Sequence, residues 1–179
     1  MRLPQIGPND TTQNKGETVL RSFSIALFCL VGAAAQPASA QASRNTVMIS
    51  AKVGAKSYES AGQGSCRHTP TAAIYGVPAA LWMVGLTGSE DAPVKNMNLT
   101  LWKPKNGGPQ QFSLSLSTGS SSHRIDVGGR GEQVGSGKAS VVMAGEGGRI
   151  EVSGKDDSGK TIELVVQCPA FAGVEAEGG

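Results

Sequence analysis

Few residues of this chain are of the types that do chemistry. The sequence of 179 residues has two histidines, His68 and His123, and three cysteines, Cys29, Cys66 and Cys168. An even number of cysteines in an oxidising compartment indicates disulfides, whereas a thiol in a reducing compartment points to a nucleophile or a metal ligand. The chemistry of these side chains therefore depends on where the protein resides.

The compartment is indicated by an apolar run over residues 24–40. It follows Arg21 and ends in Ala38-Ser39-Ala40, the small-residue pattern that signal peptidase accepts. Its unbroken apolar part is about half of the roughly 20 residues that a membrane-spanning helix needs. We therefore expect a signal peptide over residues 1–40 and a periplasmic or secreted protein that does not span the membrane.

The same segment predicts cleavage without lipidation. A lipobox requires a small residue before its cysteine, but Phe28 precedes Cys29, so we expect Cys29 to leave with the signal peptide. Residues 1–20 are polar and lack periodicity, unlike the short basic start of a signal peptide. A start at Val19, which a GTG codon would encode, gives a leader of ordinary length.

Cleavage after Ala40 leaves one pair of cysteines, and we expect Cys66 and Cys168 to form a disulfide. A loop of about 100 residues would gain roughly 4–5 kcal/mol from such a bond in the chain-entropy model. The alternative is a metal site, because thiolates and thioethers suit copper. The methionines, however, lie singly on different predicted strands, so we expect no metal and no cofactor. The residues considered for that site are Cys66, His68, His123, Met48, Met83, Met97 and Met143.

The pattern of apolar residues predicts an all-β domain over residues 41–171. Short runs alternate with period two and are separated by turn residues, which favours a β-sandwich or barrel; we take a small antiparallel β-sandwich of about 8–10 strands. The last three runs should form a meander, and the tail, residues 172–179, should be disordered. The predicted strands are 46–53, 56–66 (bulged or at an edge), 72–75, 79–86, 94–102, 111–117, 122–127, 138–144, 149–153 and 161–168.

One predicted strand offers a candidate ligand-binding surface. If Met97, Leu99 and Leu101 point inward, strand parity turns Asn96, Asn98, Thr100 and Trp102 outward. An exposed tryptophan beside amides and hydroxyls is suited to sugars, because the ring offers a flat apolar platform and the polar groups direct hydrogen bonds. The alternative is that another element covers Trp102. The other tryptophan, Trp82, has apolar neighbours, so we expect it in the core.

Other function classes find little support in the sequence. The formal net charge is +2 and basic residues do not cluster, so we expect no nucleic-acid partner. There is no G-x-S-x-G motif, and the glycines at 129, 131 and 135 are misspaced for a nucleotide loop. We therefore expect no enzyme. Asn98-Leu99-Thr100 matches a glycosylation acceptor, a chance match if the source is bacterial.

Three segments resemble the mycobacterial nineteen-kilodalton lipoprotein antigen family. They are G-x-G-S-C at residues 62–66, G-R-I-E-V-S-G at 148–154 and I-E-L-V-V-Q-C at 162–168. The resemblance implies a secreted β-rich domain with a cysteine pair and no catalytic residue; the family's lipid anchor does not carry over, because the lipobox is missing. We expect a binding or surface-interaction module of the cell envelope. Its partner would be an envelope glycan or a surface protein. The alternatives are a carbohydrate-binding domain that uses Trp102 and, less favoured, a hydrolase or metal enzyme.

Overall fold

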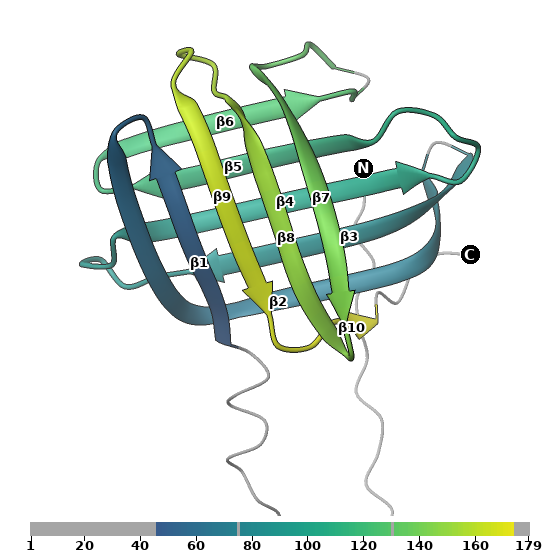
Figure 1. Ribbon diagram of the computed structural model, residues 1–179, viewed down its shortest axis with the longest axis horizontal. Helices are drawn as coiled ribbons and strands as arrows, with labels where there is room; N and C mark the ends of the chain where they lie inside the picture. The colour runs from purple at the N-terminus through teal and green to yellow at the C-terminus, as the bar shows by residue number, and fades with distance from the viewer. Residues whose placement is uncertain (1–45, 75, 130, 174–179) are drawn as a thin grey trace, which may run out of the picture. The chain divides into compact units, whose positions relative to one another are not determined.

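This computed structural model describes residues 46–74, 76–129 and 131–173. These residues form β-strands joined by turns and loops (Figure 1). The strands form one sheet in the order β6-β5-β4-β3-β2-β1-β9-β8-β7, antiparallel except for β10, which pairs with β2. The predicted all-β antiparallel class is confirmed, whereas the predicted signal peptide lies outside the described residues. The strands are β1 (Thr46–Val53), β2 (Lys56–Ile74), β3 (Val77–Thr87), β4 (Val94–Pro104), β5 (Gln111–Thr118), β6 (Ser121–Val127), β7 (Ser136–Ala144), β8 (Gly147–Lys155), β9 (Thr161–Cys168) and β10 (Ala172–Gly173).

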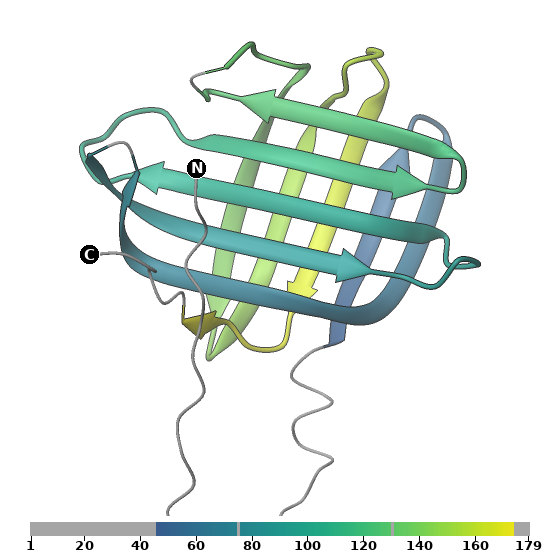
Figure 2. The same ribbon diagram turned by 180° about the vertical axis from the view of Figure 1, so that it is seen from behind.

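The sheet folds over on itself into two packed layers. One layer contains the first part of β2 with β1, β9, β8 and β7; the other contains the rest of β2 with β3, β4, β5 and β6, and the strands of the two layers cross steeply (Figures 1 and 2). The inner faces of both layers form one hydrophobic core. An isolated bridge between Asp126 and Val134 follows β6, so the sheet is nearly closed.

The bend between the layers lies in β2. This strand pairs with β1 as far as Gln63 and with β3 from Gly64 onward. We predicted one strand over 56–66, bulged or at an edge, and a separate one over 72–75. Residues 56–66 and 72–74 are indeed extended, but they belong to one strand in the middle of the sheet, so the division and the edge position were wrong. The register shift in β2 lies between Thr69 and Ala72, beyond the two glycines where a bulge was considered. A strand that changes layers needs residues that tolerate a bend and a close approach, and glycine supplies both.

Gly64 makes the closest approach at this bend. A Cβ atom there would lie 2.6 Å from Val47 Cγ2 and would also collide with the Gly85 carbonyl oxygen, whereas one at Gly62 would meet nothing nearer than 3.4 Å. We expect Gly64→Ala to lower the free energy of unfolding by about 1–3 kcal/mol, as overpacking does. Gly62→Ala, the matched control, should stay within about 0.5 kcal/mol in urea titrations. Equal losses in the two variants would contradict this account of the bend.

The C-terminal part of the chain folds as a meander. β7, β8 and β9 pair in sequence, as predicted, through turns at Gly145 and Gly159 whose φ angles are +60° and +82°. Past Phe171 we expected a disordered tail, but β10 adds two ordered residues. Ala172 and Gly173 pair in parallel with Arg67 and His68 of β2. Residues 174–179 of that tail lie outside the described residues.

Candidate functional site

The predicted disulfide is present. Cys66 of β2 and Cys168 at the end of β9 are bonded, with their Cα atoms 5.9 Å apart and a sequence separation of 102 residues. Both side chains are buried in the core. Because β1 lies between β2 and β9 in the sheet, the bond ties the part of β2 in the second layer to the middle strand of the first layer. A disulfide of this kind is consistent with an oxidising compartment outside the cytoplasm.

An aromatic cluster lies next to the disulfide. The ring of His68 stacks on Trp82, with ring centroids 4.5 Å apart, and Phe171 meets His68 edge-on. His68 Nδ1 also lies 2.9 Å from the Leu81 carbonyl oxygen. Trp82 is buried, as predicted. Since Cys66 is in a disulfide and His68 is packed in this cluster, the two residues do not form the metal site considered from the sequence.

Metal binding gains no support elsewhere in the described part of the chain. Within residues 46–74, 76–129 and 131–173, no three His, Cys, Asp or Glu side chains come together as metal ligands would. The four methionines considered as copper ligands also have separate environments. Met97 is fully buried in the core, whereas Met48, Met83 and Met143 are exposed.

The outward side of β2 to β5 carries mostly small polar side chains, and we call it the polar face. The strand register aligns Ser65, Gly85, Asn98 and Ser115 in one row across four strands. A Cβ atom on Gly85 would lie 3.5 Å from both Ser65 Oγ and Asn98 Oδ1, so the missing side chain leaves an open floor between them. The polar face consists of Ser65, Arg67, Met83, Gly85, Asn96, Asn98, Thr100, Trp102, Ser113, Ser115 and Ser117.

The residues singled out from the sequence lie together on this face. Met97, Leu99 and Leu101 are buried, and the alternate residues of β4 face outward, with Asn96 and Asn98 exposed and Thr100 and Trp102 half-buried. The Asn98 side-chain amide donates to Asn96 Oδ1 at 3.3 Å. Trp102 is flanked in register by Leu81 of β3 and Gln111 of β5. One strand thus presents an aromatic ring and two amides in a line.

A second polar constellation was not foreseen from the sequence. His123 Nδ1 donates to Asp156 Oδ2 at 2.7 Å, and Thr118 Oγ1 lies 3.5 Å from His123 Nε2. All three residues are buried. The order hydroxyl, imidazole and carboxylate resembles that of a hydrolytic triad. A nucleophile must reach its substrate, however, and the Thr118 hydroxyl is enclosed by the fold, so the structure supports a stabilising role.

Hydrogen bonds keep Asp156 ionised inside the protein. Burial alone would raise its pKa, but the bonds to His123, Ser158 and Lys160 outweigh burial and hold the pKa below the ordinary value of 3.8. Asp156 Oδ1 accepts from the Ser158 backbone N–H at 3.0 Å, the Ser158 hydroxyl at 2.8 Å and the Lys160 N–H at 2.8 Å. The carboxylate thereby holds the β8–β9 turn, and through His123 it attaches that turn to β6.

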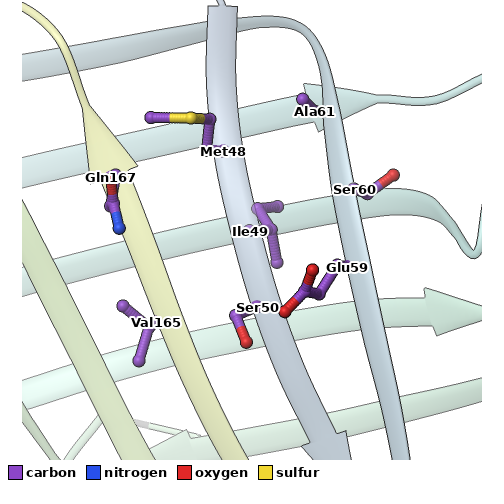
Figure 3. Close-up of a pocket in the computed structure, with 8 residues that line it drawn as sticks. All are labelled: Met48, Ile49, Ser50, Glu59, Ser60, Ala61, Val165 and Gln167. Atoms are coloured by element: carbon purple, nitrogen blue, oxygen red, sulfur yellow. The ribbon is translucent and has the colours of Figure 1, made fainter.

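The outward side of the other layer has a shallow depression (Figure 3). It lies over β2, β1 and β9, and Glu59 is the one titratable side chain among the residues that line it. Met48, Val165 and Gln167 give it mixed apolar and polar walls. Because a single carboxylate has no base or acid partner there, the depression offers a contact surface and no evident reaction chemistry.

These observations define a class: a disulfide-linked, all-β protein of two crossed layers whose outward residues form a polar face with one tryptophan. Among the described residues, no helix is both long enough and apolar enough to span a membrane. Comparisons of the chain with protein-family models, with curated proteins and with solved structures gave no match. The function is therefore argued from the chemistry of the polar face alone.

Proposed function

We propose that this chain is an exported, non-enzymatic binding module of the cell envelope, and that it binds a carbohydrate chain on the polar face. The observation that carries the proposal is the alignment of Trp102 with Thr100, Asn98 and Asn96 along the outward side of β4. The groups that could instead do covalent chemistry are engaged elsewhere. Cys66 is oxidised in the disulfide, and His123 is buried against Asp156.

The chemistry of the polar face favours a neutral sugar over other ligands. Sugars present apolar C–H patches and many hydroxyls, so they match a tryptophan ring beside amides and serine hydroxyls. Charge is sparse on and beside the face. Arg67 is the one charged side chain among its residues, and on the adjoining strand β6 Arg124 pairs with Asp126, with its Nε 2.7 Å from Asp126 Oδ2. A single cation does not make a site for an anionic chain. An extended chain of neutral sugars fits this open, flat surface.

The proposal predicts that truncating Trp102 weakens binding strongly. Aromatic residues dominate binding energy at such sites, so Trp102→Ala should weaken binding by roughly 30-fold, which corresponds to about 2 kcal/mol. Asn98→Ala, which removes hydrogen bonds, should cost about 3- to 10-fold. Calorimetric titration with soluble gluco-, manno- and chito-oligosaccharides measures both effects.

A matched control separates the polar face from the rest of the surface. Met48 is 47% exposed on the outward side of the other layer, so Met48→Ala should bind the same oligosaccharide as tightly as the unmodified protein. Fluorescence adds a second readout, because the chain has two tryptophans and Trp82 is buried. Sugar binding should therefore change the emission of Trp102. If the unmodified protein binds none of the oligosaccharides, the carbohydrate proposal is wrong.

A further inference from the structure

One edge of the sheet has unpaired backbone groups. β7 ends the strand order and pairs with β8 on one side (Figure 1). The two-residue turn after Ala144 makes Ala144 and Gly147 a hydrogen-bonded pair, so the even-numbered residues of β7 bond to β8. The N–H and C=O groups of Ala139, Val141 and Met143 therefore point away from the sheet.

A side chain blocks one end of this open edge. Gln110 Nε2 donates to the Ala139 carbonyl oxygen at 2.6 Å. Val141 and Met143 face β8 at positions without backbone hydrogen bonds, and within the described residues no other strand bonds to their N–H and C=O groups. The exposed apolar side chains of this edge lie in the same place, with Val142 61% and Met143 46% exposed. The open segment is thus short, apolar and extended, which is the form that another strand can pair with.

We propose that a second copy of this chain pairs with this edge, β7 against β7 and antiparallel, about a two-fold axis at Val142. This register pairs Val141 with Met143 of the second copy, and Met143 with its Val141. Each of the two pairs exchanges two backbone hydrogen bonds, so the N–H and C=O groups of Val141 and Met143 are used in both chains. It also leaves the Ala139 carbonyl, which Gln110 already occupies, outside the ladder.

Side-chain chemistry favours the same register. Val142, exposed in the single chain, packs against Val142 of the second copy. Lys138 is the one charged residue of β7, and this register keeps the two copies of Lys138 far apart. A two-fold axis at Val141 would instead require the Ala139 carbonyl and would displace Gln110. Pairing of β7 about Val142 therefore leaves the bond between Gln110 and the Ala139 carbonyl in place.

Cross-linking tests the register directly. Opposed residues at a non-hydrogen-bonded position lie about 4.5 Å apart at Cα, within the range of a disulfide, so Val142→Cys should form a covalent dimer under mild oxidation. Ser140→Cys is the matched control, since it is also exposed and outward on β7. The two copies of residue 140 would lie about 14 Å apart in this register and should not cross-link. Peptide mapping would identify the bridged residues.

Sedimentation of the unmodified mature protein gives the second measurement. An edge contact is small, so we expect a dimer that forms progressively between about 10 µM and about 1 mM. Val142→Lys, which places like charges face to face, should weaken dimerisation at least tenfold, whereas Met48→Lys should not change it. A monomer throughout this range, or equal cross-linking of the two cysteine variants, would overturn the proposal.

Discussion

Replacing both Cys66 and Cys168 with alanine is expected to lower the free energy of unfolding by about 4–5 kcal/mol. The bond closes a loop of 102 residues, and in the chain-entropy model its loss frees the unfolded chain by this amount. Alanine is the suitable replacement, because both sulfur atoms lie in the core and serine would bury an unpaired hydroxyl. The loss is comparable to the whole stability of a small domain, commonly about 5–15 kcal/mol. Urea titration of the protein measures it.

Reduction of the unmodified protein provides the control for this prediction. With a strong reductant present, its unfolding midpoint should fall toward that of the double alanine variant, and the variant itself should not respond to reductant. The aromatic cluster of His68, Trp82 and Phe171 lies beside the bond. Loss of the bond between β2 and β9 should therefore also change the emission of Trp82. A loss of stability below about 1 kcal/mol would show that the bond does not constrain the unfolded chain.

The sequence predicted those parts of the fold in which local pattern and final structure coincide. The three last strands alternate cleanly and are joined by glycine turns, so their meander was foreseen. β2 was divided in error at residues 67–71, which include Pro70 and show no apolar alternation. Its first part was predicted as bulged or at an edge because the inward positions 62 and 64 are glycines. Their function is to let the strand bend between layers. That requirement becomes visible only when the packing of Val47 against Gly64 is known.

The candidate sites also divide into features that the local sequence pattern predicts and features that depend on how the layers pack. The outward positions of β4 follow from parity alone, so the line from Asn96 to Trp102 could be predicted from its neighbours Met97, Leu99 and Leu101. The bond between His123 and Asp156 joins residues 33 positions apart on elements of opposite layers. The predicted meander of the last three runs implies a turn at Asp156. No local signal, however, identifies its partner, since the contact depends on how the two layers cross.

Asp156→Ala is expected to lower the free energy of unfolding by about 3–5 kcal/mol, as the loss of one partner of a buried charged network does. The change would leave the His123 ring and the backbone N–H groups of Ser158 and Lys160 without their acceptor. Buried donors without a partner cost free energy because they have given up their hydrogen bonds to water. Asp156→Asn should cost less, about 1–3 kcal/mol, because its amide oxygen still serves the turn. Urea titration at neutral pH ranks the two variants.

Unfolding measured as a function of pH separates the stability that the charge of Asp156 contributes from the stability that its hydrogen-bond geometry contributes. Its pKa is held below the ordinary 3.8, so the folded protein binds fewer protons there than the unfolded chain does. The stability that this carboxylate contributes is therefore complete at neutral pH and is lost as the pH falls below about 4.

Asp156→Asn carries no such charge and should lose less stability between about pH 5 and pH 2 than the unmodified protein. Asp157→Asn, an exposed neighbour, should follow the unmodified curve. If Asp156→Asn also follows that curve, the carboxylate does not stabilise the fold through its charge, and the bond to His123 acts by geometry alone.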